Sequence, residues 1–210
     1  MSSDSPASER NKRPILEVLR TEFEEARHVL EIGSGTGQHA VFFAREMPHL
    51  TWQTSDLAEN HDSIRARLAK DPQPNVKAPL LVDADDPGAA ALPGIDAVFS
   101  ANTAHIMSMR AVHRMFTLVG RVLPAGGKFC LYGPFNFDGE FSSESNARFD
   151  AALRQRKTSM GIRELGDLDG FASEAGMSRI RLYAMPMMNY IAVWQKAANP
   201  ARDAMSAREE

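Results

Sequence analysis

Residues Val29–Gly37 read VLEIGSGTG, and this stretch restricts the fold more than any other part of the chain. An apolar run that includes Glu31 is followed by three glycines at alternate positions, and residues 38–45 then have the pattern of a helix. Short apolar runs are typical of strands buried in a parallel sheet. Glycine allows a sharp turn and lets bare main chain approach a ligand, while the first amides of a helix point toward the same crevice. The stretch therefore predicts a strand, a ligand-binding turn and a helix.

The spacing of these glycines distinguishes between cofactors. A dinucleotide-binding turn has the pattern Gly-x-Gly-x-x-Gly/Ala, whereas here the glycines alternate and Gln38 stands where the last small residue is expected. A nicotinamide-dependent oxidoreductase is therefore disfavoured. Gly-x-Gly-x-Gly after an acidic strand end resembles motif I of the class I methyltransferases that use S-adenosylmethionine (SAM). The resemblance implies a SAM site that includes Glu31, Gly33, Ser34, Gly35, Thr36 and Gly37.

The size and charge of the chain exclude several classes of protein. Its 210 residues suit one α/β domain over 1–210, with flexible segments at 1–8 and 197–210. The net charge of -3 disfavours nucleic acid as the main partner. Cys130 is the only cysteine, and the histidines show no ligand spacing with carboxylates, so we expect no disulfide within the chain and no metal. The sequence shows neither a secretory signal nor an apolar run of membrane-spanning length, which predicts a cytoplasmic monomer or homodimer without a membrane partner.

The order of the predicted elements indicates a parallel sheet with helices on both faces. A helix is expected after Pro14, and apolar runs that alternate with helical patterns predict strands at 29–32, 50–55, 79–82, 95–100 and 128–132. Residues 179–184 and 190–194 then predict an antiparallel hairpin. We expect an α/β, Rossmann-like, seven-stranded, mostly parallel sheet that ends in a C-terminal antiparallel hairpin. This arrangement resembles that of the class I methyltransferases.

Ligands of open parallel sheets bind beyond the carboxyl ends of the strands, so the residues at those ends are candidates for the site. Asp56 follows the second strand at about the distance expected for an acid that accepts hydrogen bonds from ribose hydroxyls. Its alternative role is an N-cap for the next helix. Asp83 and Ala84 end the third strand, where SAM methyltransferases often carry an acid near adenine, although a solvated acidic loop explains them equally well. The cofactor set predicted at these strand ends is Asp56, Leu57, Asp83, Ala84 and Asn102.

The end of the fourth strand is where a SAM methyltransferase brings the cofactor and the acceptor together. Asn102 is predicted to bind either the amino-acid end of the cofactor or the acceptor, and His105 is the best candidate for a catalytic base because its unperturbed pKa lies near neutrality. A histidine that only hydrogen-bonds locally is the alternative. The strand lacks the Asn/Asp-Pro-Pro-Tyr/Phe motif of enzymes that methylate base amines, which argues against nucleic-acid bases as acceptors.

Further blocks resemble a small, little-characterised methyltransferase-like family. The resemblance runs from about Ser8 to Lys196. The blocks are residues 9–11 before 14–16, 35–39, 100–102 with 105–106, 131–135, 143–146, 149–150, 153–154, 161–163, 185–186 and 189. Met160 stands where that family usually carries an aromatic residue, which leaves the acceptor specificity open.

These blocks supply candidate cofactor and acceptor contacts, each with a structural alternative. Glu9, Arg10 and Asn11 form either an N-cap cluster or a lid in which Arg10 pairs with the carboxylate of the cofactor. Residues 146, 150 and 154 share a helical face that is either solvated or a substrate wall, while Phe149 and Leu153 are expected to face the core. The predicted acceptor contacts are Asn11, His105, Tyr132, Asn136, Asn146 and Arg154.

The sequence thus predicts an enzyme that transfers a methyl group from SAM to an O, N or S atom of a small molecule. The alternative is a catalytically inactive SAM-binding or protein-interaction module with the same fold.

Overall fold

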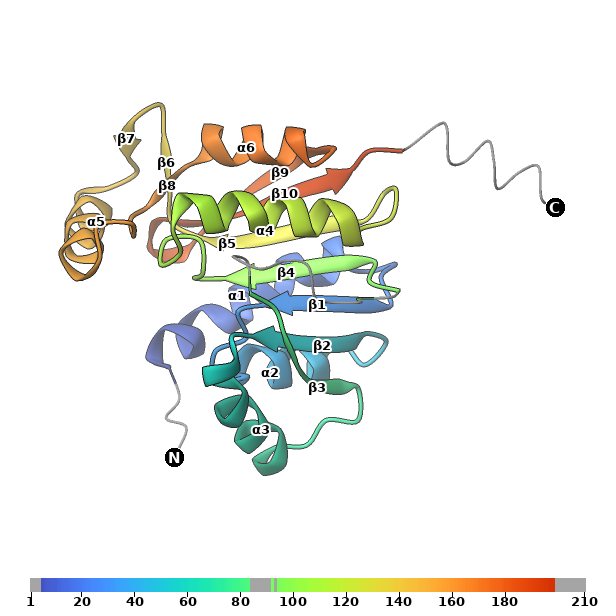
Figure 1. Ribbon diagram of the computed structural model, residues 1–210. Coiled ribbons are helices and arrows are strands. Elements are labelled where there is room, and N and C mark those ends of the chain that lie inside the picture. The colour runs from blue at the N-terminus through green and yellow to red at the C-terminus, as the bar shows by residue number, and fades with distance from the viewer. Residues whose placement is uncertain (1–4, 84–91, 93, 199–210) are drawn as a thin grey trace.

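The computed structural model describes residues 5–83, 92 and 94–198 (Figure 1). Ala84 and the outer parts of both predicted flexible segments lie outside these described residues. Seven strands form the main sheet in the order β3-β2-β1-β4-β5-β10-β9. Neighbours among the first five are parallel, while β10 is antiparallel to both β5 and β9. The predicted Rossmann-like sheet with a C-terminal antiparallel hairpin is confirmed. The strands are β1 His28–Ile32, β2 Thr51–Asp56, β3 Val76–Leu81, β4 Ala97–Ala101, β5 Lys128–Gly133, β9 Met177–Met185 and β10 Asn189–Lys196.

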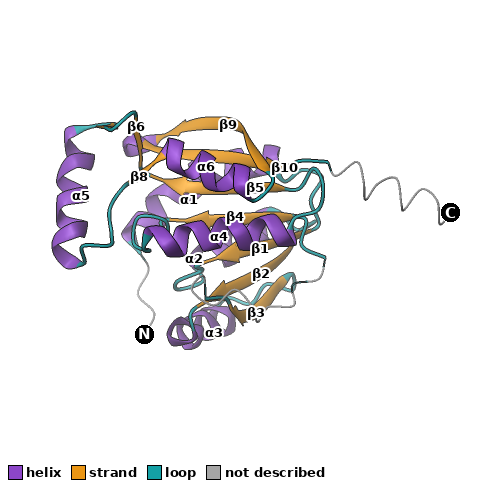
Figure 2. Ribbon diagram, turned by 45° about the horizontal axis from the view of Figure 1, so that its top comes forward, coloured by secondary structure: helices purple, strands orange, loops and turns teal. Residues whose placement is uncertain are grey.

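Helices cover both faces of this sheet (Figure 2). On one face, α1 and α2 enclose a core that contains Phe43, Trp52 and Phe99. On the other, α4 and α6 enclose a core that contains Phe116, Phe129 and Trp194. All six rings are fully buried, as expected for strands with helices on both sides. The helices are α1 Pro6–Glu22, α2 Gln38–Glu46, α3 His61–Lys70, α4 Met109–Val122, α5 Glu144–Arg156 and α6 Leu165–Glu174, and the short 3-10 helices are η1 Ala58–Asn60 and η2 Pro186–Met188.

Helix α1 begins eight residues earlier than the sequence predicts. Pro6 lies in its first turn, where the missing N–H has no intrahelical partner to lose, and the Ser5 hydroxyl accepts from the amide of Ser8. Pro14 lies inside the helix instead of starting it. Residues 6–8, which we expected to be flexible, are therefore helical. Residues 9–11 lie within the helix, so the N-cap interpretation of that cluster is wrong.

A buried carboxylate joins the end of α1 to the sheet. Glu22 accepts hydrogen bonds from Tyr183 and Arg181 of β9, both at 2.6 Å, and lies 3.0 Å from the Lys128 ammonium of β5. Burial raises the pKa of Glu22, but these three partners outweigh it and the net shift is downward. Because the carboxylate contacts both β5 and β9, it fixes the position of α1 across this face of the sheet.

A segment between β5 and α6 stands apart from the two layers. It consists of a small sheet in the order β7-β6-β8, made of β7 Glu140–Phe141, β6 Phe135–Phe137 and β8 Arg163–Glu164, together with α5. Figure 1 shows α5 beyond the edge where the parallel strands end. Leu153 is buried as predicted, whereas Phe149 is 41% exposed and does not face the core. The reason is that α5 packs along one side only, at the edge of the sheet.

The glycine turn after β1 is pressed against the loop after β4. The amides of Gly33 and Ser34 both donate to the Ser55 carbonyl at 3.0 Å, which ties the turn to β2. Gly33 has a φ of 75°, and a Cβ built on it would lie 2.4 Å from Cγ2 of Thr103. Gly35 also has a positive φ, of 58°, but nothing lies within 4 Å of its Cβ position. Only Gly33 is therefore restricted by both its backbone and its neighbour.

Gly33→Ala should destabilise the fold more than Gly35→Ala. A left-handed alanine costs about 1–2 kcal/mol at either position, and overpacking against Thr103 adds about 1–3 kcal/mol at Gly33 alone. Urea unfolding of the two variants measures this difference. Adding Thr103→Ser to Gly33→Ala removes Cγ2 and should recover the extra loss; equal losses in the two single variants would contradict the contact.

A second buried carboxyl lies under the glycine turn. Glu31 is 2% exposed and accepts a hydrogen bond of 3.1 Å from the Trp52 indole. Burial raises the pKa of Glu31 to about 7, against the lowering effect of hydrogen bonds from Trp52 and Ser34. The folded state therefore holds this proton at pH values where the unfolded chain has released it.

Glu31→Gln should change how stability depends on pH. Between the unfolded pKa of 4.5 and the folded pKa of about 7, the native wild type binds more protons than the unfolded chain, so its stability falls as the pH rises. Relative to the variant, the wild type should lose on the order of 3 kcal/mol across this window. Chemical denaturation at several pH values measures the difference, and the histidines common to both proteins cancel. Parallel stability curves would show that Glu31 ionises normally.

Candidate functional site

A cavity of about 730 Å³ opens at the carboxyl ends of the first four parallel strands. It is lined by the glycine turn after β1, the ends of β2 and β3, the loop after β4, the start of α1 and two residues of the α5 region. This is the edge at which open parallel sheets bind their ligands. The predicted cofactor residues in its lining are Gly33, Ser34, Gly35, Thr36, Asp56, Leu57, Asp83 and Asn102. Glu31, Gly37 and Arg10 do not line it.

Asp56 joins the glycine turn to the cavity. One carboxylate oxygen accepts from the Gly35 amide at 2.7 Å, and the other accepts from the Leu57 amide and the Asn60 side chain, both at 2.8 Å. Neither η1 nor α3 has a side-chain cap, so Asp56 does not have the predicted alternative role of an N-cap. Each carboxylate oxygen accepts more than one hydrogen bond, and the oxygen bound to Gly35 retains capacity for a ligand hydroxyl.

The loop after β4 holds Asn102 in a strained conformation. Asn102 has a φ of 59°, and its amide donates to the Tyr132 carbonyl at 3.0 Å. Positive φ is uncommon outside glycine, although asparagine tolerates it better than most residues. The Ser100 hydroxyl donates to the Ile32 carbonyl at 2.8 Å and lies 2.6 Å from the Thr103 hydroxyl. The side chain of Asn102 has no hydrogen bond to any described residue and lines the cavity.

His105 lies farther along the same loop. It is 7% exposed, lines the cavity, and packs edge-on against the Phe149 ring at 5.3 Å between centroids. Burial lowers the pKa of His105 to about 4, with a further contribution from the charge of Arg163. The imidazole is therefore neutral at physiological pH. Its ring nitrogens have no hydrogen-bond partner among the described residues.

The first turns of α1 cover one side of the cavity. Ser5, Ala7 and Ser8 line it, and the Gln38 side chain ties this segment to α2 by accepting from the Ser5 amide and donating to Glu9, at 2.8 and 3.0 Å. Gln38, which is too large for the last position of a dinucleotide-binding turn, therefore has a structural role in this protein.

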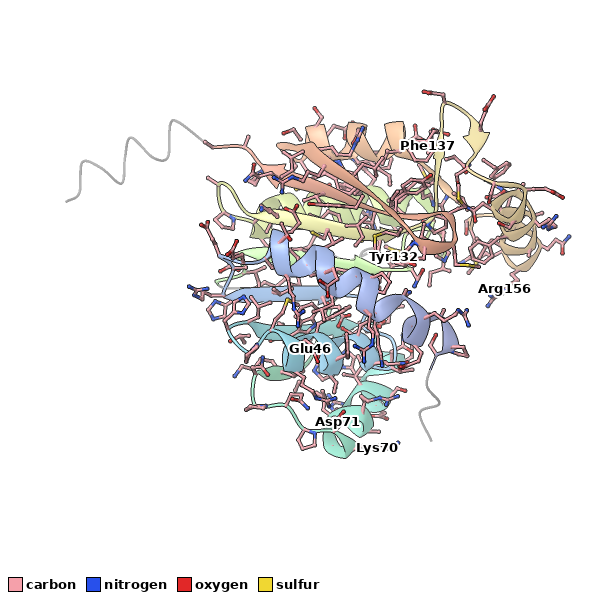
Figure 3. All side chains as sticks on the ribbon, turned by 180° about the vertical axis from the view of Figure 1, so that it is seen from behind. Glu46, Lys70, Asp71, Tyr132, Phe137 and Arg156 are labelled. Atoms are coloured by element: carbon pink, nitrogen blue, oxygen red, sulfur yellow. The ribbon has the colours of Figure 1, made fainter. Side chains whose placement is uncertain are left out.

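The predicted acceptor residues Asn11 and Tyr132 lie behind the cavity wall. Asn11 lies 2.8 Å from the ring of His39 and also hydrogen-bonds Tyr132, which Figure 3 labels. His39 lines the cavity, and burial lowers its pKa to about 4. His39 follows the glycine turn in the sequence, but the hydrogen bond of its ring is to Asn11 of α1. Asn11 therefore connects α1 with α2 and β5.

Asn136, Asn146 and Arg154 do not line the cavity either. The Asn146 amide donates to Ser142 and to the Met188 carbonyl, at 2.8 and 3.0 Å, which holds the tip of the β9–β10 hairpin against α5. Arg154 pairs with Asp150 at 2.6 Å. Because Asn146 and Asp150 are buried, the interpretation of this helical face as solvated is wrong. Oδ1 of Asn136 is buried without a partner among the described residues.

The Gly161–Arg163 segment supports the loop that carries His105. Arg163 is buried and donates to the carbonyls of Ala104, Met107 and Ser159. The Gly161 amide donates to the His105 carbonyl at 2.9 Å, and Asp150 accepts from Ile162 at 2.7 Å. Burial lowers the pKa of Arg163, with a further contribution from Arg154. The segment between β5 and α6 thus fixes the geometry of the loop.

Some lining residues have no recognisable signal in the sequence. Glu59 and Asn60 follow Asp56 closely and could have been inferred from it, whereas Ile106, Phe149 and Lys157 reach the cavity only through the placement of the loop and of α5. Among the described residues, no group of three or more His, Cys, Asp or Glu side chains is arranged to hold a metal ion. Within the same residues, every helix is too short or too polar to cross a membrane.

Solved structures with the same fold include methyltransferases. An O-methyltransferase family protein from Burkholderia thailandensis matches with a TM-score of 0.75 and 18% identity, over 90% of this chain and 57% of its own. A structure described as PigF with SAH matches with a TM-score of 0.74 and 17% identity, over 87% and 61%. Human N-acetylserotonin methyltransferase in complex with SAM matches with a TM-score of 0.70 and 13% identity, over 89% and 55%. The chain thus spans little more than half the length of these proteins, and at such identities the likeness shows the fold.

The fold-level resemblance to class I methyltransferases is therefore confirmed, while the resemblance of the individual blocks stays a prediction. The family described as Protein of unknown function (DUF938) matches residues 2–196. Because this match covers almost the whole sequence, the chain belongs to that family.

Proposed function

We propose that this protein is a SAM-dependent methyltransferase that acts on a small-molecule acceptor. The observation that carries the proposal is that a bare main-chain turn and the Asp56 carboxylate face one cavity. A Cβ on Gly35 would enter open space, so main chain and not side chain forms that part of the wall. Such a wall suits a ligand that packs closely against the backbone, and the Asp56 carboxylate suits a vicinal diol.

The described residues fit the adenosyl and methionyl parts of this cofactor. Asp56 would accept hydrogen bonds from the ribose hydroxyls, and Leu57 and Asp83 would lie beside the adenine. The free side chain of Asn102 would bind the amino-acid end. When bound, SAM supplies a methyl group on a sulfonium, which is already activated for displacement, so the protein has mainly to align the acceptor and exclude water. The start of α1 and the α5 region, which border the cavity, would provide that exclusion.

His105 would act on the acceptor as a neutral imidazole. Because burial holds its pKa near 4, a ring nitrogen is free to accept a hydrogen bond from an acceptor hydroxyl, thiol or amine. That contact would orient the acceptor and receive its proton as the new bond to carbon forms. The cavity, the net charge of -3 and the lack of a base-methylation motif together favour a small cytoplasmic metabolite over a nucleic acid.

Asp56→Asn should weaken binding of S-adenosylhomocysteine by roughly 10- to 100-fold. The variant loses charge-assisted hydrogen bonds worth about 1.5–3 kcal/mol. Isothermal titration calorimetry measures the affinity. Asp62→Asn is the matched control, because Asp62 is a fully exposed residue of α3 with a side chain 98% exposed. If S-adenosylhomocysteine does not bind the wild type, or binds Asp56→Asn equally well, the proposed cofactor site is wrong.

His105→Gln should lower the rate of methyl transfer by about 100-fold, the scale of one acid–base contact. Production of S-adenosylhomocysteine from SAM in the presence of fractionated metabolite extracts measures turnover. The wild type should show no rate step near pH 6.5, because the imidazole stays neutral down to a pKa of about 4. A step near pH 6.5 that disappears in His105→Gln would mean that His105 titrates normally. Cofactor binding without turnover in any extract would instead favour the inactive module.

A further inference from the structure

The cavity has two chemically different ends. Toward β2 and β3, its lining carries three acidic side chains, those of Asp56, Glu59 and Asp83. Toward α5, the lining is apolar and contains Ile106, Met107 and Phe149. Of the described lining residues, Lys157 alone carries a positive charge at neutral pH, since both lining histidines are neutral. The polar end suits a nucleoside, which leaves the apolar end for a second ligand.

Exposed apolar side chains mark this second end. Phe149 is 41% exposed and Ile106 46% exposed, and both border the cavity, whereas large apolar side chains are normally buried. Phe149 stands edge-on to the His105 ring, so two flat surfaces meet at the cavity wall. Such a wall gains free energy by covering a planar or branched apolar group. The His105 ring, whose nitrogens have no partner among the described residues, lines the cavity next to Phe149.

Lys157 adds a charge to this apolar wall. It follows the last residue of α5, and its ammonium pairs with no described carboxylate. Basic residues near a helix C-terminus often only complement the helix dipole, and Arg156, next to it, fits that description because it does not line the cavity. Figure 3 labels Arg156 at the end of α5. Lys157 differs from Arg156 in that it borders the cavity on the side of Phe149.

We propose that the Phe149–Lys157 end of the cavity is the acceptor subsite and that it selects a small apolar acid. The apolar body packs against Phe149 and Ile106, the anionic group pairs with the Lys157 ammonium, and the nucleophilic atom faces His105. This assignment rests on the proposed function, since it names the substrate class of the same site. It also gives Lys157, the one cation among the described lining residues, a role that a neutral acceptor would not require.

The test compares acids with their uncharged amides. Benzoate against benzamide, 4-hydroxybenzoate against 4-hydroxybenzamide, and 2-naphthoate against 2-naphthamide differ almost only in charge. Ligand-observed NMR titrations of the full chain, with and without S-adenosylhomocysteine, give their affinities without requiring turnover. The wild type should bind each acid about two- to fivefold more tightly than its amide, since Lys157 is exposed and ion pairs at exposed sites contribute up to about 1 kcal/mol.

Variants assign the preference to Lys157. Lys157→Glu should abolish or reverse the preference for the acid, whereas Arg156→Glu, which makes the same change of charge one residue away, should leave it within twofold. Phe149→Ala should weaken the acid and the amide of each pair equally. The proposal is overturned if no acid binds, if the preference survives Lys157→Glu, or if Arg156→Glu removes it as well.

Cofactor binding separates this proposal from the proposed function. Lys157→Glu should bind S-adenosylhomocysteine within threefold of the wild-type affinity. A tenfold loss would assign Lys157 to the carboxylate of the cofactor and overturn the acceptor subsite while leaving the methyltransferase proposal intact. If the wild type does not bind S-adenosylhomocysteine, the proposed function fails, and the acid–amide titrations without it still report on the charged apolar wall.

Discussion

The site depends on how closely the main chain after β1 approaches the loop after β4. At Gly33 the two are separated by less than a side chain, since an added Cβ would lie 2.4 Å from Thr103. The Ser100 hydroxyl, between Ile32 and Thr103, holds the two loops together. From the other side, Asp56 binds the Gly35 amide. The turn is thus held by both neighbouring strands, and the cavity wall is formed before any ligand arrives, which reduces the ordering that binding must overcome.

Burial shifts the pKa of three ionisable groups around the cavity toward the uncharged form. Burial holds the pKa of Glu31 near 7 and lowers those of His39 and His105 to about 4, so the low dielectric acts in opposite directions on acid and base. The electric field inside the cavity is therefore set by the few side chains that reach its surface. In the described part of the chain, three of these are acidic and lie toward β2 and β3, and one, Lys157, is basic and lies at the end of α5. Such a separation of charge would suit the two ligands of different character that we propose for this cavity.

The sequence predicted the parts of the protein whose signals are local. The mostly parallel sheet with its C-terminal hairpin follows from short patterns of apolar residues and is as predicted. The glycine turn and Asp56, which follow from equally local patterns, border the cavity at the edge of that sheet. The start of α1 was wrong because a Ser- and Pro-rich composition was interpreted as flexible, although Ser5 caps the helix and Pro6 suits its first turn. Three polar residues near strand or helix ends were predicted as acceptor contacts, but their side chains bond to other parts of the fold. Asn11 bonds to α2, Tyr132 to α1, and Asn146 to the tip of the β9–β10 hairpin. Helix α6 and the small sheet were not predicted, because β6, β7 and β8 are two or three residues long and their pairing is non-local.

One end of the cavity is formed by residues that local sequence patterns predict, and the other end is formed by contacts between distant parts of the chain. The end that suits a nucleoside is built from consecutive residues at strand ends, and these follow directly from the parallel sheet that the chain shares with methyltransferases of 13–18% identity. The other end is built by the segment between β5 and α6, in which Arg163 holds the carbonyls of the His105 loop and Gly161 donates to His105 itself. A Cβ on Gly161 would lie less than 3 Å from the side chains of Arg154 and Asp150, which belong to α5. A larger residue at position 161 would therefore require these α5 side chains to move. If the proposed function holds, acceptor chemistry would be coupled to the packing of α5, and substitutions that move this helix would alter which acceptor is bound while leaving the glycine turn and Asp56 in place.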